Sequence, residues 1–261
     1  MKLSGCILVK NNAKSIGYAV ESLHKYVDEL VIIDSGSTDG TIDIVKKYTD
    51  KIIFNEFKNF ADQRNFGITQ CQGEWVFMLD ADEVVGPNFP LIRNYLDGRY
   101  RSIALPRYNI INLNPVTYMI TKPHYLNWQT RCFRNDKKSY FWDKVHHKLG
   151  NYRPRLKCAV AHYFHLDFLF NSYATRKAKV DYYNSIEPGS GYPEAYLFED
   201  FPYQTATIIE QLDPKLLSML RQDTTLLQYP VNECSKSVQA YEEFLYHLRG
   251  FVTRLRTKIQ I

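Results

Sequence analysis

The chain has 261 residues, enough for one large domain or one domain with an appendage, and its 45% hydrophobic residues can supply a sizeable core. Its formal net charge of +5 is too small for a nucleic-acid-binding surface but suits an anionic ligand or an anionic membrane surface. The five cysteines are scattered and odd in number, which excludes a disulfide framework and favours a reducing cytoplasm.

The first hundred residues alternate short apolar runs with helical patterns. Buried strands are predicted at residues 5–9, 30–33, 51–54 and 74–79, and helices at 14–26, 39–48 and 59–69. The first apolar run ends at Lys10, too soon for a signal peptide or a membrane span. Strands that alternate with helices predict a parallel sheet with right-handed crossovers.

Beyond Gly86 the pattern changes. Residues 88–97 are predicted to be helical, and strands are predicted at 102–105 and 130–133, separated by a loop-rich stretch. A further helix is predicted at residues 173–186, before the linker sequence PGSGYP at 188–193. Two more helices are predicted after the linker, at 205–221 and 238–258. We therefore expect a domain at residues 1–187 and a helical C-terminal extension at 188–261.

The most informative segment is WVFMLDADE at residues 75–83, where a buried strand ends on Asp80, Asp82 and Glu83. In an open α/β sheet, ligands lie at the carboxyl ends of the strands. Two aspartates at such a place can hold a divalent cation, and the cation can hold a diphosphate. The alternative is an acidic turn that caps the next helix.

A second strand ends in DSGSTDGT at residues 34–41. Asp34 at this strand end can accept a hydrogen bond from a nucleobase imide N–H or a ribose hydroxyl, while Gly36 and Gly40 allow tight turns. An ordinary β–α loop would use the same residue types. Two acidic strand ends on one sheet edge nevertheless converge on one crevice, which favours a ligand site.

Three motifs together resemble a known family: residues 34–41, FADQRNFG at 60–67 and EWVFMLDADE at 74–83. In this order and spacing they resemble the family 2 inverting glycosyltransferases with the GT-A fold, and most of all the branch of bacterial lipopolysaccharide-core β-glucosyltransferases. The resemblance covers about residues 3–180. It implies a Rossmann-like α/β domain with a mainly parallel sheet flanked by helices, a nucleotide half at about 1–100 and an acceptor half at about 101–187.

The resemblance also implies roles for individual residues. Asp34 matches the acid that contacts the uracil or ribose of a nucleotide-sugar, and Arg64 the residue that reaches the base or the diphosphate. Asp80 matches the acid that faces the ribose or a metal-bound water, and Asp82 the ligand of Mn²⁺ or Mg²⁺. Asn11 matches the loop after the first strand, although the acidic pair common in the family is absent there.

An inverting transfer needs a general base on the acceptor. The related branch carries a Val-His-Glu segment, and WDKVHHKL at residues 142–149 places His147 where the glutamate would stand. His147 and Asp143 are both candidate bases. Alternatively, His146 and His147 merely alternate across a strand. The missing glutamate leaves open a degenerate, non-catalytic subunit that binds a sugar nucleotide.

Many GT-A enzymes complete the metal site with a histidine from the C-terminal part of the domain. His165 matches that position better than His162 does, and imidazole suits Mn²⁺ somewhat better than Mg²⁺. The alternative is a hydrogen-bonded structural histidine.

The last predicted helix, at residues 238–258, combines apolar positions near i, i+3, i+4 and i+7 with several cations. This pattern fits a helix that lies in the plane of a membrane, a helix of a homodimer, or a helix docked on the core. Packing of the helix on the domain is the interpretation that we favour.

The sequence thus predicts a cytoplasmic, metal-dependent inverting glycosyltransferase, with peripheral contact at the inner face of the membrane as an option. The donor would be a nucleotide-diphosphate sugar, with UDP favoured, and the acceptor a hydroxyl of a bacterial surface glycan or glycolipid core. A peptide acceptor, as in bacteriocin glycosylation, is the alternative. A nucleotidyltransferase would be expected to carry a glycine-rich phosphate loop after the first strand, where this chain has Lys10-Asn-Asn-Ala.

Overall fold

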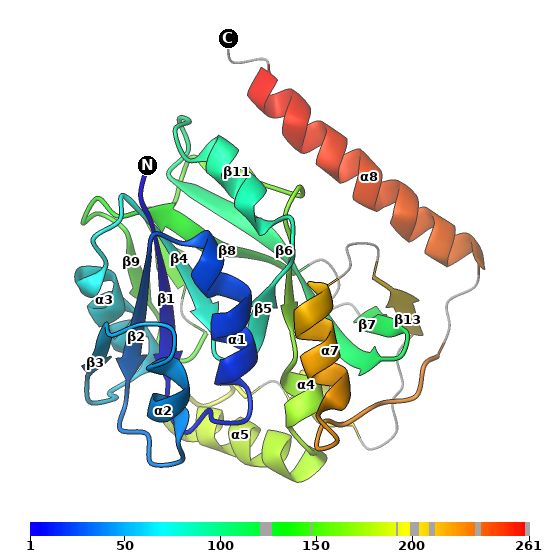
Figure 1. Ribbon diagram of the computed structural model, residues 1–261, viewed down its shortest axis with the longest axis horizontal. Helices are drawn as coiled ribbons and strands as arrows, with labels where there is room; N and C mark the ends of the chain where they lie inside the picture. The colour runs from blue at the N-terminus through cyan, green and yellow to red at the C-terminus, as the bar shows by residue number, and fades with distance from the viewer. Residues whose placement is uncertain are drawn as a thin grey trace.

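The computed structural model describes residues 1–120, 127–146, 148–191, 193–198, 204–208, 212–232 and 236–258. In these residues a curled central sheet is flanked by helices, and one long helix, α8, extends along the side of the molecule (Figure 1). The predicted α/β fold with a helical C-terminal extension is confirmed.

The first four long strands form the parallel part of the sheet. They are β1 (Leu3–Val9), β2 (Glu29–Asp34), β3 (Ile52–Phe54) and β4 (Trp75–Asp80), in the spatial order β3-β2-β1-β4. The order places β1 at the centre, with the strand ends that carry Asp34 and Asp80 on either side of it. The connecting helices are α1 (Ile16–Leu23), α2 (Thr41–Val45) and α3 (Phe60–Gln70).

Alternate residues of β1 pack on opposite faces of the sheet. Leu3, Ile7 and Val9 face α1, whereas Cys6 packs with α3. Gly67 lets α3 approach closely, since a Cβ atom at this position would lie 2.9 Å from the Sγ of Cys6. The close approach holds α3 against β1 and β2 beside the edge where these strands end.

Beyond residue 86 the sheet continues mainly with antiparallel strands. β8 (Asn127–Arg134) pairs with both β4 and β6 (Ser102–Leu113), and β7 (Val116–Ile120) forms a hairpin with β6. The sequence predicts a loop-rich stretch between residues 105 and 130. For the described part of this stretch the prediction is wrong, because β6, β7 and β8 occupy most of it. Its Asn and Pro residues at 112–115 form the tight turn of the β6–β7 hairpin.

Short strands complete the sheet and frame the candidate site. β12 (Tyr163–His165) pairs with β6 and with β5 (Glu83–Val85), and β11 (Arg155–Lys157) pairs with β6. A separate hairpin joins β9 (Tyr140–Trp142) to β10 (Lys148–Gly150).

Most of the remaining helices follow β12 along the chain. They are α4 (Asp167–Phe170), α5 (Tyr173–Ile186), α6 (Pro193–Tyr196), α7 (Pro214–Gln222) and α8 (Lys236–Lys258), while Phe89–Tyr95 is a 3₁₀ helix. The helix predicted at 205–221 is wrong in its first third. β13 (Gln204–Thr207) pairs with the edge strand β7, and α7 begins only at Pro214, where Asp213 caps it.

Candidate active site

Two acidic strand ends lie on either side of the end of β1, at one edge of the parallel sheet. Val9 of β1 is opposite Asp34 of β2, and Leu8 is opposite Asp80 of β4. Asp34 and Asp80 are therefore two strand spacings apart, about 10 Å. The edge is wide enough for a ligand that reaches across β1 from one carboxylate to the other.

Asp34 organises the loop that follows β2. Its carboxylate accepts hydrogen bonds from the backbone N–H groups of Gly36 and Ser37, both at 3.0 Å, and the residue is only 8% exposed. Asn11, which has a positive φ of 54°, accepts from the backbone N–H of Thr38 at 2.8 Å. The loops after β1 and β2 are thus joined into one polar rim around the Asp34 carboxylate.

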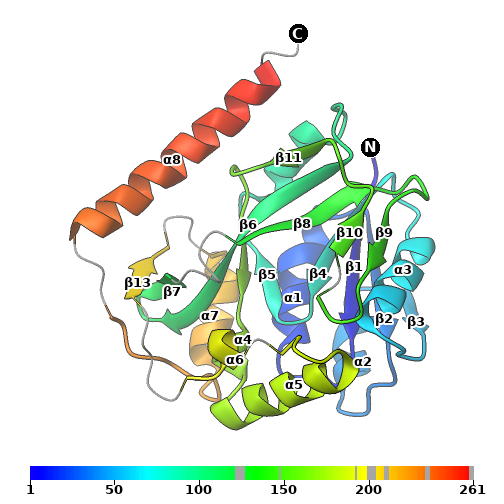
Figure 2. The ribbon, with the colours of Figure 1, turned by 180° about the vertical axis from the view of Figure 1, so that it is seen from behind.

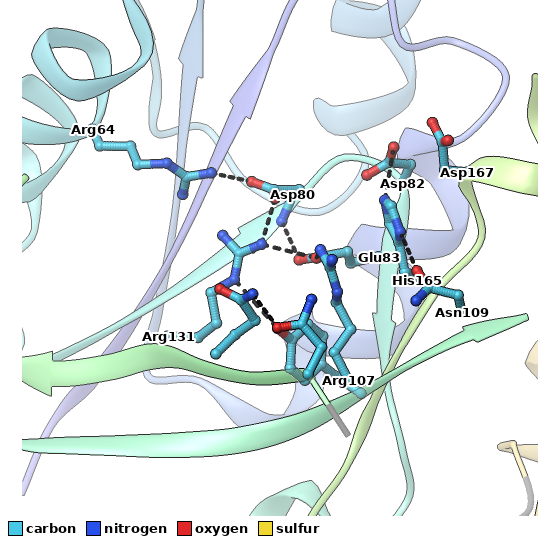
Figure 3. A network of polar contacts seen from close by, with 12 residues as sticks. Arg64, Asp80, Asp82, Glu83, Arg107, Asn109, Arg131, His165 and Asp167 are labelled. Atoms are coloured by element: carbon cyan, nitrogen blue, oxygen red, sulfur yellow. Dashed lines mark hydrogen bonds and ion pairs between the residues drawn. The ribbon is translucent and has the colours of Figure 1, made fainter. Parts of the chain in front are cut away.

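A second cluster surrounds Asp80 and alternates acids with arginines (Figure 3). Asp80 pairs with Arg64 of α3 and, at 2.5 Å, with Arg131 of β8. Arg131 also lies 2.8 Å from the buried Glu83, which pairs with Arg107 of β6 at 3.1 Å. Glu83 further accepts the backbone N–H of Asp80 at 3.0 Å, so the two acids are locked together.

This cluster carries three guanidinium groups against two carboxylates. Burial alone would lower the pKa of Arg131, but Asp80 and Glu83 raise it well above its ordinary value. In the described part of the chain, Nε and Nη1 of Arg64 are buried without a hydrogen-bond partner, as is Nε of Arg107. Unused donors and a surplus positive charge make this part of the site suited to an anion.

A third cluster lies beside it and joins Asp82, His165 and Asp167 (Figure 3). Each residue offers a ligand atom, and these atoms all lie within 4.8 Å of one another. The distance from Nε2 of His165 to Oδ2 of Asp82 is 3.4 Å. Strand pairing places His165 beside Asp82. His165 is opposite Glu83 in the β12–β5 pair, and the backbone N–H of Leu166 donates to the carbonyl of Asp82 at 2.9 Å.

The neighbours of the third cluster prepare it for a cation. Nδ1 of His165 lies 2.8 Å from Oδ1 of Asn109, so the Nδ1–H donates and Nε2 is turned toward Asp82, to which it offers a lone pair in the neutral ring and an N–H in the charged ring. Asp167 is fully buried; its Oδ1 accepts from Lys179 at 2.8 Å, whereas its Oδ2 has no hydrogen-bond partner among the described residues. A lone pair and an unsatisfied carboxylate oxygen facing the same space fit a divalent cation.

Both acids are ionised at neutral pH. Burial alone would raise the pKa of Asp82, but the charge and hydrogen bond of His165 and the charge of Lys179 lower it. Burial likewise opposes ionisation of Asp167, and Lys179 nevertheless holds the pKa of Asp167 far below its ordinary value. Lys179 balances one of the two carboxylates, which leaves one negative charge for a metal ion or another cation.

The structure brings together some of the predicted residues and adds others. Asp82 and His165 lie close together, while Asp80 and Arg64 pair with each other in the neighbouring cluster. The turn after β4 continues into β5 and does not cap a helix. His162 lies apart from the cluster, with its ring stacked on Tyr246 of α8 at 5.0 Å.

Sequence reasoning missed four charged residues of the site: Arg107, Arg131, Asp167 and Lys179. Asp167 had a detectable signal, because it follows His165, the last residue of β12, by two residues and begins α4. The two arginines gave none, since they come from antiparallel strands whose register the sequence did not reveal.

The loop between β9 and β10 holds the candidate bases. Asp143 has a φ of 80° and lies 3.3 Å from Lys148, while His147 lies outside the described residues. The neighbouring His146 contacts the ring of Tyr183 on α5, with centroids 6.2 Å apart, and Lys179 lies 6.0 Å from the centroid of the same ring. This chain of contacts links the loop to the cluster of Asp82, His165 and Asp167.

Comparisons with known proteins agree on one family. The family model described as "Glycosyl transferase family 2" matches residues 4–164, which is more than half of the chain. An uncharacterized glycosyltransferase of Rickettsia felis is 35% identical over 82 residues, which cover 31% of this chain and 29% of that protein. The lipopolysaccharide core biosynthesis glycosyltransferase LpsC of Rhizobium meliloti is 38% identical over 88 residues, 32% of each chain.

The chain thus spans about a third of the length of these curated relatives. Among solved structures, S. aureus TarS 1-349 in complex with UDP is similar to this chain with a TM-score of 0.44 and 17% identity, over 76% of this chain and 70% of that one.

Proposed function

The chain belongs to glycosyl transferase family 2, and from this premise we propose that it is a metal-dependent inverting glycosyltransferase. It would take a nucleotide-diphosphate sugar, with UDP favoured, and transfer the sugar to a hydroxyl group. The observation that carries the proposal is the cluster of Asp82, His165 and Asp167 beside surplus arginine charge, at the sheet edge that also holds Asp34. In this proposal residues 1–187 are the catalytic domain and 188–261 its extension.

The polar rim around Asp34 would receive the nucleoside. The Asp34 carboxylate lies at the sheet edge and can accept a further hydrogen bond from a uracil imide or a ribose hydroxyl. Asn11 would hold the facing loop in place through its bond to Thr38. Arg64, with two free donor nitrogens, would turn toward the diphosphate or the base, releasing part of its pairing with Asp80.

Asp82, His165 and Asp167 would hold Mn²⁺ or Mg²⁺. When bound there, the metal neutralises charge on the leaving diphosphate. Lys179 would hold Asp167 in position through its bond at 2.8 Å and add a positive charge near the same oxygens. The three side chains leave coordination positions open for a substrate, because the metal commonly takes six ligands.

Transfer would proceed by single displacement. The acceptor oxygen forms a bond to the anomeric carbon of the sugar, the bond from that carbon to the diphosphate oxygen breaks, and a base on the protein takes the acceptor proton. His147 and Asp143 on the β9–β10 loop are the candidates. Burial by itself would raise the pKa of Asp143, but a hydrogen bond shared with Glu187, together with the hydrogen bond and charge of Lys148, lowers it, so Asp143 is ionised but weakly basic.

The base assignment predicts unequal effects of two substitutions. We expect His147→Ala to lower the transfer rate by about a hundredfold, the lower range for loss of a general base, while nucleotide binding is retained. Asp143→Ala should lower it much less because its pKa is already depressed. Steady-state rates and nucleotide affinity of both variants would be measured; a large loss only in Asp143→Ala moves the assignment to Asp143, and no loss in either removes the loop from the mechanism.

For the acceptor, we propose a hydroxyl of a bacterial glycolipid core or surface glycan. The support is the similarity to LpsC, whose name places it in lipopolysaccharide core biosynthesis. A peptide acceptor is the second candidate, and transfer assays with truncated glycolipid cores and with Ser/Cys-containing peptides would distinguish the two.

The donor class can be tested without knowing the acceptor. Thermal unfolding would be followed with UDP-, GDP-, CMP- and dTDP-sugars, each with and without Mn²⁺. A ligand at a hundred times its Kd adds about 2.7 kcal/mol, which raises the Tm of a chain of this size by roughly 5 °C or more. We expect a UDP-sugar with Mn²⁺ to give the largest shift. If no nucleotide gives a metal-dependent shift, the proposal fails.

A further inference from the structure

Helix α8 presents polar residues to the body of the protein. Glu242 and Thr253 are 7% and 2% exposed, and they lie on the side of α8 that contacts the sheet. The hydroxyl of Tyr118 donates to Glu242 at 3.2 Å, and the backbone N–H of Ala159 donates to Oγ1 of Thr253 at 3.1 Å. The expected packing of α8 on the domain is therefore found, but the helix contacts the body through Glu242, Tyr246 and Thr253 and not through its large apolar side chains.

The opposite side of α8 is apolar and exposed. Its large side chains recur at intervals of three or four residues, so they line one face of the helix. Their exposed fractions are 58% for Tyr241, 59% for Phe244, 41% for Leu248, 56% for Phe251 and 38% for Leu255. Figure 2 shows α8 set off at the edge of the fold, with this long ribbon alone beyond β13 and β11. An apolar stripe of this length on a helix surface marks an interaction site.

The charges of α8 favour one kind of partner. The helix carries five cations, Lys236, Arg249, Arg254, Arg256 and Lys258, against Glu242 and Glu243, and Glu242 is buried against Tyr118. Aromatic and aliphatic side chains on one face, together with an excess of cations, characterise helices that lie in the interface of an anionic bilayer. Among the described helices, none combines the length and apolarity needed to cross a bilayer.

A second copy of the chain fits this face less well. A strip of fifteen helical residues is about 22 Å long and about 10 Å wide. On its own, such a strip does not reach the roughly 800 Å² that each partner buries in a stable interface. A lipid surface needs no matched partner surface, and the surplus cations add to the binding.

We propose that the outer face of α8 docks the protein on an anionic membrane surface, with the helix axis in the membrane plane and Phe244 and Phe251 inserted among the lipids. The proposed site of sugar transfer is a separate part of the chain. A variant can therefore lose vesicle binding and keep donor binding, or the reverse, and each result tests only one of the two proposals.

The test is co-sedimentation of the full chain with vesicles of phosphatidylcholine and phosphatidylglycerol at 7:3, and with vesicles of phosphatidylcholine alone. The parent should bind the anionic vesicles, with at least tenfold weaker binding to the neutral ones and in high salt. The double variant Phe244→Ser/Phe251→Ser should lose at least tenfold in binding. The matched control Phe54→Ser/Leu91→Ser removes two exposed apolar side chains elsewhere, 66% and 41% exposed, and should bind as the parent does.

Two further measurements keep the outcomes separate. The Phe244→Ser/Phe251→Ser variant should keep the metal-dependent thermal shift with its donor, which shows that it is folded. Light scattering of the parent should give a monomer whose mass the substitutions do not change. The proposal is overturned if the parent does not bind anionic vesicles, or if the Phe244→Ser/Phe251→Ser variant binds them as well as the parent does. It is also overturned if light scattering shows that the parent is a dimer and that the double substitution dissociates it.

Discussion

Replacing Asp82 by Asn is expected to lower metal-dependent sugar transfer about a thousandfold. The substitution keeps the shape of the side chain but removes one of the two carboxylates that face His165. A metal that stabilises a leaving diphosphate contributes several kcal/mol, and about 4 kcal/mol corresponds to a thousandfold change in rate. The measurement is the initial rate over a range of Mn²⁺ concentrations, together with the metal-dependent shift in Tm.

A matched control for this variant is Asp181→Asn on α5. Asp181 pairs with Lys177 at 2.9 Å on the surface, where exposed ion pairs contribute little. This control should keep the parent rate, and both variants should unfold near the parent in the absence of metal. If Asp82→Asn transfers sugar within a factor of two of the parent, the assignment of the metal cluster is wrong.

Replacing Arg131 by Met is expected to destabilise the protein by about 3 kcal/mol, at the low end of the range for breaking a buried ion pair. Arg131 is 5% exposed and serves both Asp80 and the fully buried Glu83, so its loss leaves a buried charge with one fewer partner. Arg107 remains on Glu83 at 3.1 Å, which limits the loss. Urea unfolding would measure the difference in the free energy of unfolding.

A double-mutant cycle separates the charge from the packing. In the Arg131→Met background, Glu83→Gln should cost far less than it does in the parent, because the buried charge that lacks a partner is removed with it. Arg155→Met, a substitution of an arginine that bonds Thr130 on an exposed part of the surface, should change stability by less than about 0.5 kcal/mol. Equal effects of Arg131→Met and Arg155→Met would show that the buried cluster does not support the fold.

The two acidic strand ends that form the proposed nucleotide site were predictable from local patterns. Buried strands ending on Asp34 and Asp80 can be recognised along the chain, and a parallel sheet places their ends together without further information. The residues of the proposed metal site come together only through contacts between segments that are distant in sequence. His165 followed from the family resemblance, whereas Asp167 and Lys179 depend on how β12, α4 and α5 fold back on the turn after β4.

The orientation of α8 shows another limit of sequence patterns. The apolar spacing correctly predicts a helix with one apolar face, yet the same spacing is compatible with burial and with exposure. The side of α8 that faces the body depends on the surface against which the helix packs. Here that surface includes the hydroxyl of Tyr118 and the backbone of Ala159. The pattern within the helix contains no information about that surface.

The most direct test of the account is the position of Mn²⁺ in a crystal of the protein grown with UDP, located by its anomalous scattering. The account predicts one strong peak within ligand distance of Asp82, His165 and Asp167, in contact with the diphosphate. A peak on Asp80 and Glu83, or UDP bound with no metal beside Asp82, would contradict it.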